Sequence, residues 1–392
     1  MNEKILFVFS GQYPWDIRLS KEINTLKKCG YKISVLSRNL TRLNAFDKID
    51  EVVNYRLGNI FPSLKMDVIL SIPIFFNPLW IFKIAKTIWV DKPDLIIIRE
   101  IPLAPTVIFF AKIFKIKVIL DVAEHFPALM KVSKKYNSNI FSKFMISTLN
   151  FYNFIEKISV KNSDKILTVV EESKNRLIKE YGLKEKNLYV VSNTPETIPP
   201  FYVKKIVNDK LNIIYTGNVD GVFRGLKTLL LAATLLKENN NIVFNIIGDG
   251  SELNSLIEFK NNNGLDNVNF LGKFEHDKLL QYLYTQDIGI VPHEKTDEIE
   301  YTIPNKLFDY MSYSLPVITS SAKPLKRITE SIDCGFVFEA GNPESLADLI
   351  LKIYENRQSL ITKAKNAHSA IIEKYKWDND SKVFCGVVEE IL

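Results

Sequence analysis

The stretch EYTIPNKLFDYMSYSLPVITS, residues 300–320, decides the fold of this chain more than any other segment. Pro304 suits the first turn of a helix, because its φ is already fixed and its missing N–H is not needed there. The apolar stripe expected of that helix consists of Leu307, Phe308, Tyr310 and Met311. Residues 317–319, Val-Ile-Thr, are typical of a buried strand. The segment therefore predicts a helix-to-strand connection of an α/β fold.

The start of this helix is a candidate nucleotide site. Free backbone N–H groups at a helix start bind anions, which makes Ile303, Asn305 and Lys306 candidates for phosphate contact. The carboxylate of Asp309, further along the helix, can accept hydrogen bonds from a ribose diol. One short segment can thus hold the phosphate and the ribose of a nucleotide. An ordinary α/β crossover with a solvated Asp309 fits the same spacing.

The sequence PNKLFDYM, followed by a small-residue turn and PVI, resembles the PNKLFEYM…PVI signature of family 4 glycosyltransferases. These are retaining enzymes with the GT-B fold, and the resemblance extends over nearly the whole chain. It implies an α/β fold of GT-B type, in which two doubly wound Rossmann-like domains face a central cleft. Ligands of such sheets lie beyond the carboxyl ends of the strands.

Length and composition agree with two globular domains. The chain has 392 residues, of which 46% are apolar and 24% charged, and this length exceeds one hydrophobic core. The N-terminal MNEKILFVFSG predicts a buried strand rather than a secretory leader. Cys29, Cys334 and Cys385 form no CxxC pair, which indicates a reducing cytoplasm. The four histidines are too dispersed for a helical zinc motif, so we expect no metal and no cofactor besides the nucleotide-sugar co-substrate.

Strand and helix patterns alternate in both halves of the chain, which predicts parallel sheets covered by helices. Between the halves, residues 193–202 (NTPETIPPFY) carry three prolines and resist both helix and central strand. With the roles that the resemblance implies, we expect an acceptor-binding domain at 1–195 and a linker at 196–210. A nucleotide-sugar-binding domain is expected at 211–375, and a helix at 376–392 that returns to the first domain.

The two halves differ in charge. Residues 1–200 hold 30 Lys and Arg against 19 Asp and Glu, whereas residues 201–392 hold 21 against 26. The basic first half indicates an anionic partner, and nucleic acid is disfavoured because no recognition motif accompanies the charge. A membrane surface is the other candidate. For Phe75–Val90 we favour a helix packed on its sheet, and for the lysine-rich Met130–Lys165 a surface role.

The turn after the predicted strand 213–216 is glycine-rich and contains Gly217, Asn218 and Arg224. Glycines let the backbone approach a ligand closely, and a guanidinium matches phosphate oxygens. The resemblance implies that this turn replaces the family's G-R-x5-K-G, whose Arg and Lys neutralise the leaving diphosphate. Arg224 falls on the Lys position and Asn218 on the Arg position, so either Arg224 acts alone or Lys227 assists it. A plain loop is the alternative.

Two further turns are candidates to meet the nucleotide. Gly248 belongs to a Gly-Asp-Gly turn that resembles the family's GDGP, although a tight turn without a ligand fits as well. The segment FLGKF, residues 270–274, resembles the segment whose backbone meets the base, which makes Lys273 and Phe274 candidates. Backbone contacts do not reveal the base, so UDP and GDP both stay open, with UDP favoured.

The family pattern E-x7-E places one acid at the donor sugar and a second acid at the ribose. Asp309 matches the second acid. The first position holds Tyr301, and we expect the neighbouring Glu300 to substitute for the missing acid. A solvated acidic loop is the alternative.

The first half offers candidates for the acceptor side. Gly11 follows the first strand, where the resemblance implies that its backbone faces the diphosphate. DVAEHFPAL, residues 121–129, resembles the family's D-x-H-E-x-x-P, although Ala123 stands at the His position. Glu124 or His125 is expected to orient the acceptor hydroxyl group. A structural role for His125 is the alternative.

The sequence therefore predicts a retaining, metal-independent hexosyltransferase with Arg224, Glu300, Glu124 and His125 as catalytic candidates. It would move a sugar from a nucleotide-diphospho-sugar to a glycan or polyprenyl-diphosphate-linked acceptor in bacterial surface polysaccharide synthesis. The expected place is the cytoplasm, at the inner face of the cell membrane. The alternatives are another GT-B sugar-nucleotide enzyme such as an epimerase, and a degenerate non-catalytic sugar-nucleotide-binding protein.

Overall fold

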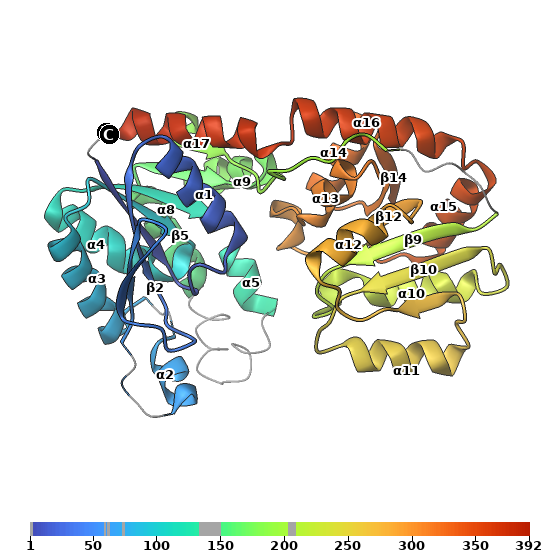
Figure 1. The fold of residues 1–392 in the computed structure, drawn as a ribbon, viewed down its shortest axis with the longest axis horizontal. Helices are drawn as coiled ribbons and strands as arrows, with labels where there is room; N and C mark the ends of the chain where they lie inside the picture. The colour runs from blue at the N-terminus through green and yellow to red at the C-terminus, as the bar shows by residue number, and fades with distance from the viewer. Residues whose placement is uncertain (1–2, 59, 61–62, 73–74, 133–149, 203–208) are drawn as a thin grey trace. The chain divides into compact units, whose positions relative to one another are not determined.

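The computed structural model describes residues 3–58, 60, 63–72, 75–132, 150–202 and 209–392. The chain divides into unit 1, residues 1–193 with 380–392, and unit 2, residues 194–379 (Figure 1). Each unit has a largely parallel sheet, covering helices and its own hydrophobic core. The prediction of two Rossmann-like α/β domains is confirmed.

In the described part of unit 1, eight strands form one sheet in the order β3-β4-β2-β1-β5-β6-β7-β8. Neighbouring strands are parallel except β3 and β4, which form an antiparallel pair at one edge. Central parallel strands are covered on both faces and are therefore continuously apolar, as LIIIR of β5 illustrates. The strands are β1 Lys4–Phe9, β2 Lys32–Ser37, β3 Phe46–Ile49, β4 Val52–Arg56, β5 Leu95–Arg99, β6 Lys117–Val122, β7 Lys165–Thr168 and β8 Leu188–Val190.

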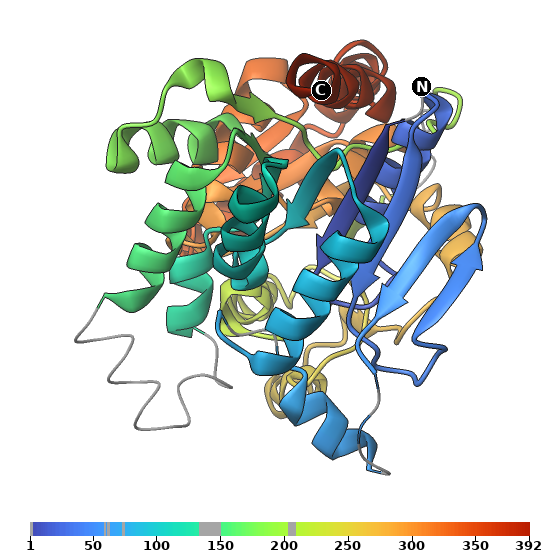
Figure 2. The same ribbon diagram turned by 90° about the vertical axis from the view of Figure 1, so that its left-hand side faces the viewer.

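Helices cover both faces of this sheet. Helices α3, α4 and α8 supply residues to one core cluster, and Figure 2 shows α3 and α4 in front of the sheet. Helix α1 lies on the other face, and its end meets α17 where the Sγ atoms of Cys29 and Cys385 are 2.7 Å apart. The helices are α1 Ile17–Lys28, α2 Leu64–Leu70, α3 Pro78–Asp91, α4 Ala104–Phe114, α5 Phe126–Val132, α8 Phe151–Asn162, α9 Glu171–Tyr181 and α17 Trp377–Ile391.

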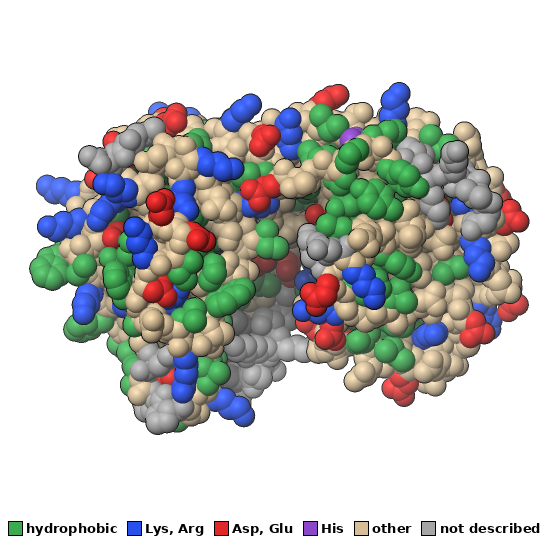
Figure 3. Space-filling model, viewed as in Figure 1, with side chains coloured by type: hydrophobic (Ala, Val, Ile, Leu, Met, Phe, Trp, Pro, Cys, Tyr) green, Lys and Arg blue, Asp and Glu red, His purple; other side chains and the backbone are tan. Residues whose placement is uncertain are grey.

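Helix α3 has a buried apolar side and an exposed apolar side. The buried side consists of Trp80, Ile84 and Ile88. Phe82 and Trp89 are instead 81% and 67% exposed, and Phe109 and Ile113 of the adjacent α4 are exposed as well. Figure 3 shows hydrophobic side chains beside Lys and Arg over these helices, at the left of the view. The packed helix favoured for residues 75–90 is present, and it also leaves an apolar outer side.

The second stretch expected at a membrane surface, Met130–Lys165, is described only in part. Residues 133–149, which include Lys134, Lys135 and Lys143, lie outside the described residues. Over the part of the chain that the structure describes, no helix is both long enough and apolar enough to cross a bilayer.

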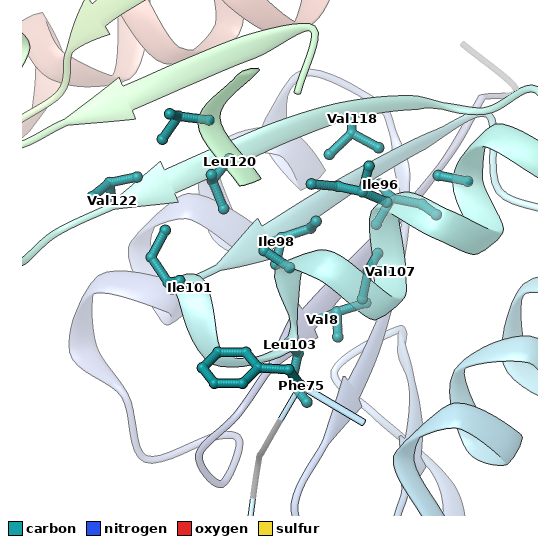
Figure 4. Packing of buried hydrophobic residues seen from close by; sticks show 14 of the residues in the cluster. Val8, Phe75, Ile96, Ile98, Ile101, Leu103, Val107, Val118, Leu120 and Val122 are labelled. Atoms are coloured by element: carbon teal, nitrogen blue, oxygen red, sulfur yellow. The ribbon is translucent and has the colours of Figure 1, made fainter. Parts of the chain in front are cut away.

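The core on the α3 and α4 face follows the two-residue period of the strands. Ile96 and Ile98 of β5 and Val118 and Leu120 of β6 point to the same side of the sheet, toward Val107 of α4 (Figure 4). All five side chains are at most 2% exposed. Burial of such a side chain contributes roughly 1.5–3 kcal/mol relative to full exposure, so this layer fixes the helices on the sheet.

A buried cluster of charges ties α1 to β5 and β6. The Arg18 guanidinium lies 2.8 Å from Asp121 and 3.0 Å from Glu22, and the Arg99 guanidinium also contacts Asp121. Burial alone would raise the pKa of Asp121, but the two guanidiniums lower it to about 2. Buried charges are tolerated only when they are paired, so the three elements are held in one register.

Within the described residues of unit 2, six parallel strands form a sheet in the order β11-β10-β9-β12-β13-β14. The strands are β9 Leu211–Thr216, β10 Ile242–Ile247, β11 Val268–Phe270, β12 Ile288–Val291, β13 Val317–Ser320 and β14 Gly335–Phe338. The helices are α10 Leu226–Leu235, α11 Leu253–Asn263, α12 His276–Leu283, α13 Lys306–Ser312, α14 Lys323–Ile332, α15 Pro343–Glu355 and α16 Ser359–Glu373.

The segment 300–320 forms α13 and β13 as predicted. The four stripe residues are at most 1% exposed, and every residue of β13 is buried, so both predictions are confirmed. The predicted helix start is wrong by two residues. The helix begins at Lys306, and Pro304 contributes the carbonyl group that accepts the Leu307 N–H at 3.1 Å.

We predict that Asp121→Asn destabilises unit 1 by about 3–5 kcal/mol, because it leaves buried guanidiniums without their counter-charge. Glu185→Gln is the control. It removes the 3.1 Å contact with Lys174 by a carboxylate that is 75% exposed, and should cost less than about 1 kcal/mol. Urea denaturation followed by circular dichroism measures both variants, and equal losses would contradict the prediction.

The same cluster predicts an acid limit of stability. Because the pKa of Asp121 is lowered to about 2, its stabilisation is complete above its ordinary pKa and is lost as the pH falls from about 4 toward 2. In Asp121→Asn this part of the pH dependence should be missing.

Candidate functional site

Two tight turns at the carboxyl ends of β9 and β10 lie side by side. The Gly217 N–H donates to the Ile247 carbonyl at 2.9 Å, and the Val219 N–H donates to the Asp249 carbonyl at 3.0 Å. Gly248 has φ +156°, and a Cβ atom there would lie 1.8 Å from the Gly217 carbonyl oxygen. Only glycine fits at this contact, so Gly248 allows the turns to meet.

Asn218 organises the first of these turns. Its Oδ1 accepts the Asp220 N–H at 2.8 Å, and its carbonyl group accepts the Tyr215 hydroxyl at 2.7 Å. The side chain thus closes a local turn of the kind that Asn favours. The position matched to a family arginine therefore has a structural function in this fold.

Arg224 directly precedes Gly225 and the start of α10. Gly225 has φ +72°, and a Cβ atom there would lie 1.7 Å from the Pro292 carbonyl oxygen, so the chain passes close to the end of β12. The Arg224 guanidinium lies 4.9 Å from the Phe223 ring centroid, and its buried Nε has no hydrogen-bond partner among the described residues. Lys227 is exposed on α10.

Lys306 of unit 2 is a buried lysine. The residue is 8% exposed, and its Nζ lies 3.7 Å from the ring centroid of Tyr215. A Cβ atom on Gly217 would lie 3.1 Å from this Nζ, so the ammonium group borders the glycine turn. Nζ has no hydrogen-bond partner in the described part of the chain. Burial and the nearby charge of Arg224 place the pKa of Lys306 well below its ordinary value.

His293, which follows β12, is fully buried beside these cations. Neither ring nitrogen has a hydrogen-bond partner among the described residues. Burial, with added repulsion from Lys306 and Arg224, lowers the pKa of His293 well below its ordinary value. The ring is therefore neutral at physiological pH and can donate or accept one hydrogen bond to a ligand. Sequence reasoning missed this residue, although its place directly after a buried strand was a usable signal.

The acids before α13 have different partners from those expected. Glu300 accepts the Lys323 N–H at 3.1 Å, and its carboxylate lies 2.8 Å from the Lys323 ammonium, so it holds the start of α14. Glu298 is 7% exposed, and its Oε2 has no hydrogen-bond partner in the described structure. Burial raises the pKa of Glu298, and the charge of Arg224 opposes that shift. Glu298 is thus a buried acid under the influence of Arg224, and the sequence did not single it out.

The other candidates of unit 2 lie around this centre. Ile303 is buried, whereas Asn305 and Asp309 are exposed at the start of α13. Lys273 is exposed after β11, and the Phe274 ring lies 5.5 Å from the Tyr282 ring. The carboxyl ends of β9, β10 and β12 therefore bring together one group, which consists of Gly217, Asn218, Arg224, Gly248, His293 and Lys306.

The candidates of unit 1 lie at the carboxyl ends of β1 and β6. The Gly11 carbonyl group accepts the Arg38 N–H at 2.8 Å. Glu124 is exposed and His125 is half-buried in the segment between β6 and α5. The His125 carbonyl group accepts the Leu129 N–H at 3.0 Å, which starts α5. Asp121 of the same motif is held by arginines and anchors this segment.

No group of three or more His, Cys, Asp or Glu side chains in the described residues has the arrangement of a metal site. In unit 2 the groups available to a ligand are instead basic side chains and backbone N–H groups, which bind anions. A buried lysine and an arginine beside glycine turns suit phosphate oxygens.

Comparison with known proteins identifies a family model and similar sequences. Residues 200–373 match the model of the family described as Glycosyl transferases group 1. The chain is similar to "Uncharacterized glycosyltransferase MJ1069" of Methanocaldococcus jannaschii, with 20% identity over 92% of this chain and 91% of that protein. "Uncharacterized glycosyltransferase MJ1178" of the same organism is 23% identical over 57% of this chain and 58% of its own length.

Solved structures share the fold over the whole chain. Sucrose-phosphate synthase from Thermosynechococcus elongatus has a TM-score of 0.78 at 13% identity and covers 99% of both chains. Anabaena HepE in complex with UDP-glucose has a TM-score of 0.69 at 14% identity, with 99% of both chains covered. WaaG, a glycosyltransferase involved in lipopolysaccharide biosynthesis, has a TM-score of 0.68 at 13% identity and covers 98% of this chain and 99% of its own. At such identities the likeness shows the fold alone, which is GT-B.

We predict that Lys306→Met makes the ligand-free protein more stable by about 1–3 kcal/mol, because an unpartnered buried donor is replaced by an apolar side chain of similar length. The same variant should lose most of the stabilisation that inorganic pyrophosphate gives the wild type. Differential scanning calorimetry with and without pyrophosphate measures both effects.

Lys326→Met is the control for this variant. Lys326 is 51% exposed on α14 and contacts Glu330 at 3.9 Å. Its substitution should change neither quantity appreciably. A Lys306→Met protein that is less stable than the wild type, and yet keeps the pyrophosphate effect, would contradict the prediction.

Proposed function

We propose that this chain of GT-B fold, whose residues 200–373 match the group 1 model, is a glycosyltransferase that transfers a hexose from a UDP-sugar to a glycan or lipid-linked acceptor. The observation that carries the proposal is the buried Lys306 ammonium group, which borders the Gly217 turn without a hydrogen-bond partner among the described residues. A diphosphate supplies the missing acceptor oxygens. The similarity to HepE, solved with UDP and with UDP-glucose, supports UDP as the nucleotide.

The proposed chemistry needs a stabilised leaving group. The bond between the anomeric carbon and the β-phosphate oxygen breaks, and the acceptor oxygen forms a bond to the same face of the sugar. The acceptor proton passes to the departing phosphate oxygen, so no protein nucleophile is required. Arg224 and Lys306 offset the charge that develops on the diphosphate, as preorganised electrostatics.

The remaining candidates take roles around this centre in the proposal. Asp309, exposed on α13, accepts hydrogen bonds from the ribose diol. Gly248 lets the turn after β10 approach the nucleotide, and the backbone near Lys273 meets the base. Glu298 contacts the donor sugar in place of the predicted Glu300, because the Glu300 carboxylate is bound to Lys323.

The acceptor side of the proposal rests on unit 1. Helices α3 and α4 expose aromatic and aliphatic side chains together with Lys86 and Lys112, and Lys83 of α3 is half-buried (Figure 3). Asp91 is the one carboxylate within the residue ranges of these two helices, and it is 4% exposed. Such a surface suits an anionic bilayer, in which apolar side chains insert while lysines meet headgroups. A polyprenyl-diphosphate-linked acceptor of bacterial surface polysaccharide synthesis would be delivered there, at the inner face of the cell membrane.

We predict that UDP raises the melting temperature of the wild type more than GDP, ADP or CMP does, since a ligand stabilises the state that binds it. Arg224→Ala should then lower kcat/KM for UDP-glucose by about a hundredfold to a thousandfold, the usual effect of losing one donor to a developing anion. Release of UDP is measured with and without a lipid-linked glycan acceptor.

Lys326→Ala is the matched control for Arg224→Ala and should retain full activity. Conversion of UDP-glucose to another UDP-sugar in the absence of acceptor would indicate an epimerase instead. Full activity of Arg224→Ala would show that the guanidinium does not stabilise the leaving diphosphate.

We predict that the double substitution of Phe82 and Trp89 by serine abolishes co-sedimentation with vesicles of phosphatidylglycerol and phosphatidylcholine. Binding of the wild type should weaken in salt, because the Debye length is about 10 Å at 0.1 M. Ile372→Ser, a change at a 45% exposed apolar residue of unit 2, should bind as the wild type does. Equal binding of all three proteins would exclude this surface.

A further inference from the structure

Glu100 has a backbone conformation that side chains rarely adopt. It directly follows β5, and its φ and ψ are +73° and 161°. This region of φ and ψ is occupied almost exclusively by glycine, and other residues are found there chiefly at functional sites. The Glu100 N–H donates to the Asp121 carbonyl at 3.0 Å, so the anchored end of β6 holds the strained residue in place.

The side chain of Glu100 lines a cavity of about 190 Å³ within unit 1. The polar wall of the cavity consists of Ser10, Glu100 and Glu124, and the Ser10 hydroxyl donates to Glu100 Oε2 at 3.2 Å. The rest of the wall is apolar and includes Ile101, Pro102, Val122, Phe126, Leu129 and Met130. A cavity with an apolar wall and a few converging polar groups is typical of a small-molecule site.

Burial and the charges around Glu100 bring the pKa of its carboxyl group close to neutral pH. Burial raises the pKa of Glu100, with smaller contributions in the same direction from Glu124 and Asp16. Arg99 and the Ser10 hydroxyl oppose the shift, and the resulting pKa is about 7. Near neutral pH the group can therefore accept a hydrogen bond as a carboxylate or donate one as an acid.

The composition of the cavity selects the chemistry of its ligand. Two carboxyl groups on one wall repel a phosphate group, so the cavity does not take the diphosphate part of a substrate. Hydroxyl groups, in contrast, bind to carboxylates and to the Ser10 hydroxyl, and the C–H face of a sugar ring can pack on the apolar wall. The volume is below the roughly 300–1,000 Å³ of sites for drug-sized ligands, which limits the ligand to about one ring.

We propose that this cavity binds a neutral sugar ring of the acceptor, and that Glu100 hydrogen bonds to one of its hydroxyl groups and orients it. The proposal rests on the proposed function, because it names the recognition group for the second substrate of that reaction. The backbone strain at Glu100 then has a purpose: a glycine would relieve the strain but would lack the carboxyl group.

The test compares Glu100→Gln and Glu100→Gly with the wild type, with p-nitrophenyl glycosides of glucose, galactose, mannose and N-acetylglucosamine as acceptor probes. Saturation-transfer NMR measures binding of each glycoside, and transfer from UDP-glucose gives KM and kcat. Loss of one hydrogen bond to a charged group should raise the KM for the preferred glycoside by about tenfold to a hundredfold. The UDP-induced shift in melting temperature should not change.

Two further measurements separate a binding role from a structural one. The KM of the wild type for the glycoside should change as the pH crosses about 7, whereas Glu100→Gln should show no such change. Glu100→Gly should melt at a higher temperature than the wild type while transfer to the glycoside falls. Glu51 has φ +68° in the exposed turn between β3 and β4, so Glu51→Gly is the matched control. It should also raise the melting temperature, but with no effect on transfer.

Several outcomes would overturn the inference. These are binding of none of the four glycosides to the wild type, an unchanged KM in Glu100→Gln, and equal loss of UDP binding and glycoside binding in that variant. A failure of UDP to stabilise the wild type would instead count against the proposed function, because the NMR comparison of wild type and Glu100→Gln needs no donor.

Discussion

The buried ammonium group of Lys306 is the constraint on which the arrangement of unit 2 depends. Without a hydrogen-bond partner among the described residues, it can persist only if the surrounding structure prevents its side chain from reaching water. The apolar stripe of α13 provides that restraint, because its four residues are buried in the core. The Tyr310 hydroxyl adds a direct link to the sheet by accepting the Thr216 N–H at 2.8 Å. The position of the Lys306 side-chain nitrogen is therefore fixed before any ligand arrives.

The neighbours of Lys306 are two tight backbone turns, a buried histidine and an arginine. The backbone turns at Gly217 and Gly248 meet so closely that a Cβ atom on Gly248 would overlap a carbonyl oxygen. His293 stays neutral because its burial and two nearby cations disfavour its charged form. Arg224 is held at the start of α10 by the close passage of Gly225 along the end of β12. Each of these features has a cost to stability, and together they form the site that we propose for a diphosphate.

In unit 1, in contrast, the charges of the buried cluster are paired. Arg18 and Arg99 are paired with Asp121 in the interior, so these charges add rigidity to the unit. The strain lies instead in the backbone of Glu100, next to the anchored end of β6. A side chain is held at a defined angle when the structure that supports it is rigid, as the salt-bridged end of β6 is here. The two proposed sites thus differ in physical origin: a buried lysine in unit 2 and a strained backbone in unit 1.

Local patterns in the sequence determined the alternation of strands and helices, the buried stripe of α13 and the glycine turns, since these follow from periodicity and from backbone freedom over a few residues. The hairpin of β3 and β4 and the short α2 gave no comparable signal, because edge strands and exposed helices lack a continuous apolar run. Only the tertiary structure decided which charges are paired and which are not. Glu300 is bound to Lys323 while Glu298 lies under the influence of Arg224, and Lys306 is buried, because solvation and partner distance are set by residues far apart in the chain.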